Sequence, residues 1–297
     1  MPVDDLKPID IKHKGTFDRF FLQDPPEISE LTFTNLFIWR HKYHPVWLEW
    51  EDCLLVILGP DGRAPFGLPP VGTGDKVEAL DVLVEQLRQM APEAEIHRVS
   101  EDFVRNYLNH DRYESVLDRD NSDYVYSCQD LIRLSGRRYH RKKNHLNRFL
   151  NSYQFKYRKM DEQLVVDFLD MQEKWCQIRE CVESPELLSE DYAVREALIY
   201  FGQLGYQGGA IEINSDIEAF SLGEPLNSNT AVVHIEKANP EIQGLYVAIN
   251  QLFCKNAWSD MEYVNREQDL GIEGLRKAKE AYYPHHMVNK YIVIPRK

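Results

Sequence analysis

Two segments near the C-terminus decide the fold: Ala231-Val-Val-His-Ile-Glu-Lys237 and Met261-Glu-Tyr-Val-Asn265. Both are short and rich in β-branched or aromatic residues, which predicts β-strands. Residues 245–258, between them, and residues 271–282, after them, have the apolar spacing of helices. With further strands expected at 209–214, 218–223 and 291–295, this part of the chain predicts a mixed sheet with helices and so an α+β fold.

A similar order of elements is expected earlier in the chain. The helices indicated by apolar periodicity are 17–21, 28–40, 77–90, 131–150 (interrupted near Gly136), 162–181 and 191–204. The strands indicated by alternation are 46–50, 53–59, 95–99, 113–117 and 153–158. We therefore expect two related α+β domains, residues 1–120 and 121–297. A polar turn within 119–130 would separate them, and the candidate active site would lie in the second.

The composition is typical of a globular protein, with 43% hydrophobic and 28% charged residues. The longest apolar run, residues 53–58, is too short to span a bilayer, and the N-terminal residues lack the features of a signal peptide. Five cysteines without a C-x-x-C pair indicate reduced thiols, and we expect Cys176 and Cys181 to be small core or surface residues. These features predict a cytoplasmic protein without a bound metal.

Positive charge is concentrated in one segment of an acidic chain. The formal net charge is −13, yet residues 133–159 contain ten Lys or Arg and no acidic residue. Like charges four residues apart destabilise a helix slightly unless an anion relieves them. The segment therefore predicts a site for an anionic partner, with a solvated helix face as the alternative. The candidate anion-binding residues are Arg137, Arg138, Arg141, Lys142, Lys143 and Arg148.

His234 and Glu236 are two residues apart on a predicted strand, so both side chains are expected on one face of the sheet. A carboxylate beside an imidazole can take a proton from an amine or hydroxyl nucleophile. We therefore name Glu236 as the candidate general base and His234 as its helper. The alternative is an ordinary cross-strand pair on a solvated sheet face.

Five polar residues, Asn265-Arg-Glu-Gln-Asp269, link a predicted strand to the helix expected from Gly271. Ligands of open mixed sheets often bind where a strand end runs into a helix start. Asp269 is suited to cap the helix. An Arg flanked by Asn and Glu can hold a carboxylate, a phosphate or an ammonium group by directed hydrogen bonds. Asn265, Arg266, Glu267 and Asp269 are therefore the candidate substrate-binding residues.

Several motifs of other catalytic classes are missing from the sequence. It contains no G-x-x-x-x-G-K-[ST], no G-x-G-x-x-G and no H-E-x-x-H. It also has no G-x-S-x-G nucleophile elbow, and no Cys lies in a known nucleophile signature. Covalent catalysis is therefore not expected.

Three motifs carry a family resemblance: Ser135-Gly-Arg-Arg-Tyr-His-Arg-Lys-Lys-Asn-His-Leu-Asn-Arg-Phe149, Leu226-Asn-Ser-Asn-Thr-Ala-Val-Val-His-Ile-Glu-Lys-Ala238 and Tyr263-Val-Asn-Arg-Glu-Gln-Asp-Leu-Gly-Ile-Glu-Gly-Leu-Arg-Lys-Ala-Lys279. Through them the chain resembles bacterial proteins of unassigned function that are similar to the C-terminal catalytic domain of phosphatidylglycerol lysyltransferase. The resemblance covers most of the chain. It implies two tandem GNAT-like acyltransferase domains, each a mixed, mostly antiparallel sheet flanked by helices, as in Fem-type aminoacyltransferases.

The resemblance also implies a reaction. Such relatives move an aminoacyl group from charged tRNA to an amine or a lipid hydroxyl. Acetyl-CoA-dependent members of the fold bind pyrophosphate through a Q/R-x-x-G-x-G/A turn. The matching residues here are Pro240-Glu-Ile-Gln-Gly-Leu-Tyr246. Glu241 would repel the phosphates and Tyr246 would obstruct their approach to the helix N-terminus, so acyl-CoA is the less favoured donor.

We thus expect an aminoacyl or acyl transferase without a tightly bound cofactor. Charged tRNA would dock on the basic segment, and a small-molecule or peptide amine would be the acceptor. A lipid acceptor is disfavoured because the sequence contains no transmembrane segment. Two alternatives stay open: a non-catalytic RNA- or nucleotide-binding module on the same fold, and an acetyl-CoA-dependent N-acetyltransferase.

Overall fold

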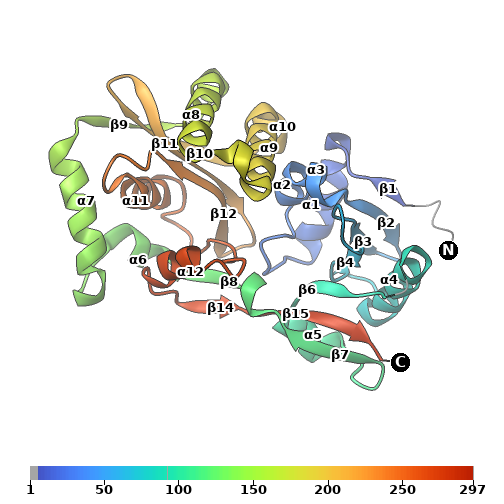
Figure 1. Ribbon diagram of the computed structural model, residues 1–297. Coiled ribbons are helices and arrows are strands. Elements are labelled where there is room, and N and C mark those ends of the chain that lie inside the picture. Colours follow the sequence, from blue (N-terminus) through green and yellow to red (C-terminus); the bar gives the residue numbers. More distant parts are fainter. Residues whose placement is uncertain (1–5, 92, 297) are drawn as a thin grey trace. The chain divides into compact units, whose positions relative to one another are not determined.

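The computed structural model describes residues 6–91 and 93–296. The chain divides into two compact units (Figure 1). The first contains the chain up to Asp123, Gln268–Ile272 and the chain from Met287 onward. The second consists of Tyr124–Glu267 and Glu273–His286.

The first unit is built on a mixed sheet with helices. Its elements are β1 (Lys7–Pro8), η2 (Ile11–His13), α1 (Lys14–Gln23), α2 (Phe33–Ile38), α3 (Arg40–Tyr43), β2 (Val46–Trp50), β3 (Cys53–Leu58), β4 (Phe66–Gly67), β5 (Val71–Gly72), α4 (Lys76–Met90), β6 (Ile96–Ser100), α5 (Glu101–Tyr107), β7 (Tyr113–Leu117), η3 (Arg119–Asn121) and β15 (Lys290–Pro295). The strand order is β1-β2-β3-β4-β6-β15-β7, and β5 also pairs with β3. The β4–β6 pair is parallel, whereas the other pairs are antiparallel.

The second unit has a seven-stranded sheet and more helices than the first. Its elements are β8 (Asp123–Ser127), α6 (Cys128–Arg133), η4 (Arg137–Tyr139), α7 (His140–Ser152), β9 (Phe155–Lys159), η5 (Glu162–Leu164), α8 (Val165–Ile178), η6 (Cys181–Glu183), α9 (Pro185–Ile199), α10 (Phe201–Leu204), β10 (Gln207–Ile213), β11 (Asp216–Pro225), β12 (Thr230–Ala238), α11 (Leu245–Ala257), β13 (Tyr263–Asn265), α12 (Glu273–Glu280) and β14 (His286–Val288). The strand order is β14-β8-β13-β12-β11-β10-β9, and the division between the units falls within β8, after Asp123, and within β14, after His286. β12 and β13 are parallel, whereas β9 to β12 form an antiparallel series.

Both units combine antiparallel strands with one parallel crossover. In the first, α4 connects the parallel strands β4 and β6. In the second, α11 connects β12 and β13. Asp75 starts α4 by accepting hydrogen bonds from the backbone of Val77 and Glu78, and the apolar face of that helix packs into the core of the first unit. The expected α+β fold with two tandem GNAT-like sheets is confirmed.

The C-terminal strand corrects one part of the expected domain division. The sequence assigned all of residues 121–297 to the second domain, but β15 lies in the first sheet between β6 and β7. Val293 pairs with Ile96 on one side and Ser115 on the other, and it is fully buried in the first core. The physical reason is that β15 supplies hydrogen-bond partners for the second edge of β6 and for β7. Distance along the chain does not reveal this pairing.

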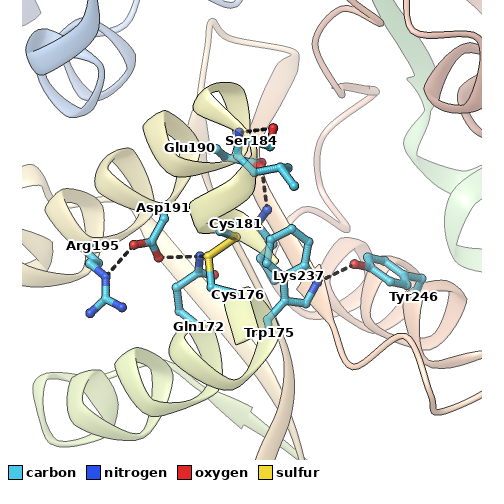
Figure 2. Close-up of a disulfide and its surroundings, with 11 residues drawn as sticks. Gln172, Trp175, Cys176, Cys181, Ser184, Glu190, Asp191, Arg195, Lys237 and Tyr246 are labelled. Carbon is cyan, nitrogen blue, oxygen red and sulfur yellow. Dashed lines mark hydrogen bonds and ion pairs between the residues drawn. A yellow bond between two sulfur atoms is a disulfide. The ribbon is translucent and has the colours of Figure 1, made fainter. Parts of the chain in front are cut away.

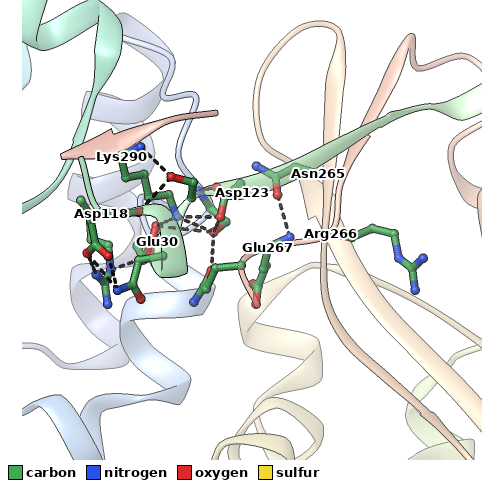
Figure 3. Close-up of polar contacts among 12 residues, drawn as sticks. Glu30, Asp118, Asp123, Asn265, Arg266, Glu267 and Lys290 are labelled. Atoms are coloured by element: carbon green, nitrogen blue, oxygen red, sulfur yellow. Dashed lines mark hydrogen bonds and ion pairs between the residues drawn. The ribbon is translucent and has the colours of Figure 1, made fainter. Parts of the chain in front are cut away.

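A buried polar cluster lies in the first unit (Figure 3). Lys290 has no exposed surface, and its ammonium lies 2.5 Å from Glu30 and 2.6 Å from Asp123. Arg98 pairs with Glu30 at 3.0 Å and with Asp118 at 2.9 Å. Two cations thus balance most of the charge of three carboxylates that are largely removed from water.

Cys176 and Cys181 form a disulfide, which corrects the expectation of reduced thiols at these positions (Figure 2). Helix α8 ends at Ile178, and Glu180 adopts a left-handed conformation with φ 53°. The chain therefore doubles back and brings the two Cα atoms within 5.1 Å. The turn at Glu180 causes this reversal of the chain. The five-residue spacing of the two cysteines does not by itself predict that they are bonded.

The other three cysteines, Cys53, Cys128 and Cys254, are buried free thiols. Burial raises the pKa of each of them. Such thiols are poor nucleophiles at neutral pH. Within residues 6–91 and 93–296, no helix is both long and apolar enough to cross a membrane.

Candidate active site

His234 lies at an irregularity in β12. Leu222 of β11 pairs with Ile235, but the next residue, Gly223, pairs with Val233, so His234 is the extra residue of a bulge. A bulge interrupts the alternation of side chains along a strand. The shift lies between Val233 and Ile235, so that His234 and Glu236 share a face stays a prediction. His234 contacts Glu267 through Nδ1 and Glu224 through Nε2, at 2.9 Å in each case.

The environment of His234 favours its protonated form. Burial, which lowers the pKa, is the largest single influence, but the hydrogen bonds and charges of Glu224 and Glu267 outweigh it and raise the pKa of His234 to about 9. At neutral pH the ring is an imidazolium that donates through both nitrogens. It therefore cannot accept a proton, and the geometry favours a positioning role over the expected catalytic one.

Replacing His234 by Gln should make the free energy of unfolding less dependent on pH. The pKa of His234, about 9, lies above its ordinary value of 6.5, so its stabilising effect is fully present below pH 6.5 and is lost as the pH rises through 9. We expect His234→Gln to cost on the order of 3 kcal/mol at pH 6.5 and progressively less up to pH 10. Urea unfolding at several pH values measures the difference. His44→Gln, at an exposed pair with Asp61, is the control. A difference that stays constant with pH would contradict the assignment.

Glu236 forms the centre of a second group of contacts. Its Oε1 lies 2.9 Å from Nη2 of Arg266, and both side chains are largely buried, at 13% and 14% exposure. Its Oε2 accepts a hydrogen bond from Nδ2 of Asn250 in α11 at 3.0 Å. Both carboxylate oxygens are therefore engaged. That Glu236 is a general base stays a hypothesis, and its geometry favours holding Arg266 in place.

Arg266 is enclosed by aromatic rings. Its guanidinium lies 4.9 Å from the ring centre of Tyr282 and 5.7 Å from that of Tyr126. Burial lowers the pKa of Arg266, but the charge of Glu236 and other neighbours raise it above the ordinary value, so the guanidinium stays charged. In the described residues, Nη1 of Arg266 and Oδ1 of Asn250 are buried without a hydrogen-bond partner. The site thus retains one donor and one acceptor that a bound group could satisfy.

Lys142 belongs to this interior group. It was expected on the anion-binding surface, but its ammonium lies 3.8 Å from the ring centre of Tyr282. Burial, followed by the charge of Arg266, lowers the pKa of Lys142 to about 8. The ammonium of Lys143 donates to the carbonyl of Arg133 at 3.5 Å, and its role in anion binding stays a prediction.

Four arginines of the basic segment lie on its exposed surface. Helix α6 ends at Arg133, and Gly136, with φ 87°, precedes η4 and α7, so the expected break near Gly136 is confirmed. Arg138 pairs with Asp130 at 2.7 Å, and Arg148 donates to Gln243 at 2.7 Å. Arg137, Arg138, Arg141 and Arg148 are all exposed, and together they are called the arginine face below.

The loop after β13 is shaped mainly by its own side chains. Asn265 is fully buried, and its Oδ1 accepts a hydrogen bond from the backbone of Glu267 at 2.8 Å, as Figure 3 shows. Glu267 has a positive φ of 58°. Asn265 therefore fixes the turn that presents Arg266.

Asp269 has a structural role in the first unit. It is fully buried, accepts a hydrogen bond from the backbone of Gly271 at 2.9 Å and pairs with Arg119 at 3.3 Å. Helix α12 begins only at Glu273, so Asp269 closes the preceding turn instead of capping the helix. Among the four expected substrate-binding residues, Arg266 is the one that faces Glu236.

Residues 25–294 match the family described as phosphatidylglycerol lysyltransferase, C-terminal. The chain belongs to this family. A protein of unknown function from Bacteroides thetaiotaomicron has 32% sequence identity, a TM-score of 0.91 and coverage of 98% of this chain and 99% of its own. The structure of L-PGS from Bacillus licheniformis has 14% identity, a TM-score of 0.65 and coverage of 94% and 91%, which shows a shared fold.

A more distant relative is an uncharacterized protein of Mycoplasmoides gallisepticum, which is 24% identical over 182 residues. The match covers 60% of this chain and 58% of that protein, so the chain spans little more than half of this relative's length.

The start of α11 corresponds to the turn through which acetyl-CoA-dependent members of the fold bind pyrophosphate. Gly244 precedes the helix with φ 87°, and a Cβ at this position would lie 2.3 Å from the carbonyl oxygen of His145. Only glycine fits such a close approach. Tyr246 accepts a hydrogen bond from Nε1 of Trp175 at 3.1 Å (Figure 2). A backbone oxygen and a fixed aromatic ring thus border the helix N-terminus in this family member.

Three residues of the site were missed in the sequence: Asn250, Tyr282 and Glu224. Asn250 had a usable signal, because it is a polar residue in a helix whose neighbours Ala248, Ile249 and Phe253 are apolar. Tyr282 and Glu224 carry no comparable signal. Their roles follow from contacts with residues far away in the sequence.

Proposed function

We propose that this protein transfers an aminoacyl group from charged tRNA to an amine or hydroxyl acceptor. The family to which the chain belongs is named for a lysyltransferase, so a transferase of the acyl or aminoacyl kind is the class it indicates. The tRNA donor and the acceptor are the parts that we add. A tRNA donor also implies work in the cytoplasm, where charged tRNA occurs.

One observation carries this proposal: helix α7 joins a charged surface to the buried polar group. Arg141 and Arg148 are exposed on α7, with Arg137 and Arg138 in η4 just before it. Lys142 of the same helix reaches inward to Tyr282. A phosphate backbone bound on the arginine face would thus lie on the same helix that supplies a group to the Glu236–Arg266 pair.

The start of α11 supports tRNA over acyl-CoA as donor. A pyrophosphate needs free backbone N–H groups and a close approach at a helix N-terminus. Here the carbonyl of His145 lies against Gly244, and Glu241 adds negative charge. The arginine face presents the opposite charge. The donor therefore fits better on the arginine face.

The test of the proposed function is incubation with a mixed pool of charged tRNAs. Loss of each aminoacyl ester is followed with ethanolamine, which carries both an amine and a hydroxyl, and with a no-enzyme control. Enzyme-dependent loss of at least one ester supports the proposal. Consumption of acetyl-CoA instead would favour an N-acetyltransferase. Retention of tRNA without consumption of either donor would favour a binding module.

Charge reversal on the arginine face should weaken tRNA binding. Arg137→Glu/Arg141→Glu removes two exposed cations, so affinity should fall and the salt dependence should decrease by about one unit of slope for each lost phosphate contact. Filter binding of uncharged tRNA at several salt concentrations measures this effect. Lys12→Glu/Lys174→Glu changes the net charge equally outside the basic segment. Equal weakening in both double variants would show that only net charge matters.

A further inference from the structure

We propose that Lys142 is the catalytic residue that carries the proton from the acceptor to the leaving group. This inference rests on the proposed function and goes further, because it names the group that handles the proton. It also moves Lys142 from the surface role suggested by the sequence to the centre of the site.

Lys142 differs from the other titratable groups of the site in its hydrogen bonds. Glu236 has both oxygens engaged, by Arg266 and Asn250. His234 has both ring nitrogens engaged by carboxylates. Lys142, by contrast, has no hydrogen-bond acceptor and no carboxylate partner in the described part of the chain; its ammonium lies over the Tyr282 ring. It is therefore the titratable group at this centre whose nitrogen is open to a substrate.

The charged groups around Lys142 make its neutral form accessible. Burial removes water from the ammonium, Arg266 and Arg141 repel it, and only Glu236 favours its charge. These effects together lower the pKa of Lys142 to about 8. A buried lysine near cations is a known way to obtain a base that works near neutral pH. Arg266 cannot fill this role because it stays protonated.

The neutral amine of Lys142 takes the proton from the acceptor N–H or O–H while the acceptor lone pair forms a bond to the ester carbonyl carbon. The bond between that carbon and the ribose oxygen of tRNA then breaks, and its electron pair stays on the ribose oxygen. The Lys142 ammonium returns the proton to this oxygen. The products are an amide or ester of the acceptor and a free ribose hydroxyl, with Lys142 neutral again.

Lys142→Arg is the variant that separates proton transfer from charge. Arginine keeps the positive charge and can stack on Tyr282, but it does not release a proton. With the charged-tRNA pool as donor and glycerol as acceptor, turnover should fall by roughly 10² or more, while filter binding of tRNA stays within about twofold of wild type. Lys255→Arg makes the same substitution at an exposed position of α11 and should retain full turnover.

The dependence of the transfer rate on pH is a second measurement. A purely structural role of Lys142 would not produce a change of this rate near pH 8. Glycerol does not titrate near pH 8, so with wild type the rate above the no-enzyme control should rise with pH through about 8 as Lys142 loses its proton. Lys142→Ala should lack this rise at low activity, and the neutral form of added methylamine should restore part of the rate at which aminoacyl-glycerol forms. This product is the readout because methylamine can itself accept the aminoacyl group.

The outcomes separate the two proposals. Three results support the proton-carrier role. Lys142→Arg loses turnover, the wild-type rate rises with pH through about 8, and methylamine restores part of the rate of Lys142→Ala. Full turnover in Lys142→Arg, or a flat wild-type profile, overturns that role and leaves the transfer of aminoacyl groups intact. If wild type consumes no charged tRNA with glycerol or ethanolamine, the proposed function itself fails.

Discussion

Replacing Glu236 with Gln should lower both the stability of the protein and the rate of transfer. The substitution keeps the shape of the side chain but leaves the largely buried guanidinium of Arg266 without its counter-charge. Breaking one side of a buried ion pair costs about 3–5 kcal/mol of unfolding free energy. Turnover should fall by roughly 10², because Arg266 loses the contact that positions it. Urea unfolding and loss of aminoacyl ester measure the two effects.

A double variant separates these effects. Glu236→Gln/Arg266→Met removes both charges, so most of the lost stability should return while turnover stays low. Glu212→Gln is the matched control in the same sheet. Glu212 pairs with Arg158 at 2.6 Å, but the Arg158 side chain is 42% exposed and keeps its contact with water when the pair is lost, so we expect only a small change. If the double variant regained turnover with its stability, the pair would be structural only.

The fold was largely predictable because it depends on local patterns. The hairpin β2–β3, helix α4 and the crossover β12–α11–β13 lie close to where apolar spacing placed them. Strand β15 was correctly found as a strand but placed in the wrong sheet. Its sequence of Ile, Val and Ile suits either sheet, and its partners β6 and β7 are more than 170 residues away. Long-range pairing of this kind leaves no periodic signal in a single sequence.

The candidate site was only partly predictable, for related reasons. Glu236 and Arg266 were both singled out, but their ion pair joins strand β12 to the loop after β13, and the two residues are 30 positions apart in the sequence. The one-residue bulge at His234 changed its partners, and alternation alone cannot show a bulge. The run Arg141-Lys142-Lys143 looked uniform in the sequence. On a helix, consecutive residues point in different directions, so one of the three became an interior residue.

Replacing Lys290 with Met should strongly destabilise the first unit. The ammonium of Lys290 is fully buried between Glu30 and Asp123, at 2.5 and 2.6 Å. Methionine fills a similar volume but leaves both carboxylates short of a cation, which should cost about 3–5 kcal/mol. Urea unfolding at pH 7.5 measures the loss. Lys174→Met, at an exposed pair with Asp216, should change stability by about 0.5 kcal/mol or less.

The pH dependence of this loss tests its electrostatic origin. Burial is the main cause that raises the pKa of Glu30, and Asp123 raises it further, while Lys290 and Arg98 lower it. Removing Lys290 should raise this pKa again, so the folded variant takes up a proton more readily than the unfolded chain. Its deficit relative to wild type should therefore shrink as the pH falls from 7.5 to 5. Adding Glu30→Gln should recover part of the stability at pH 7.5, because one uncompensated charge is gone. A deficit that is independent of pH and unchanged by Glu30→Gln would mean that lost packing around the Lys290 side chain, and not its charge, holds this cluster together.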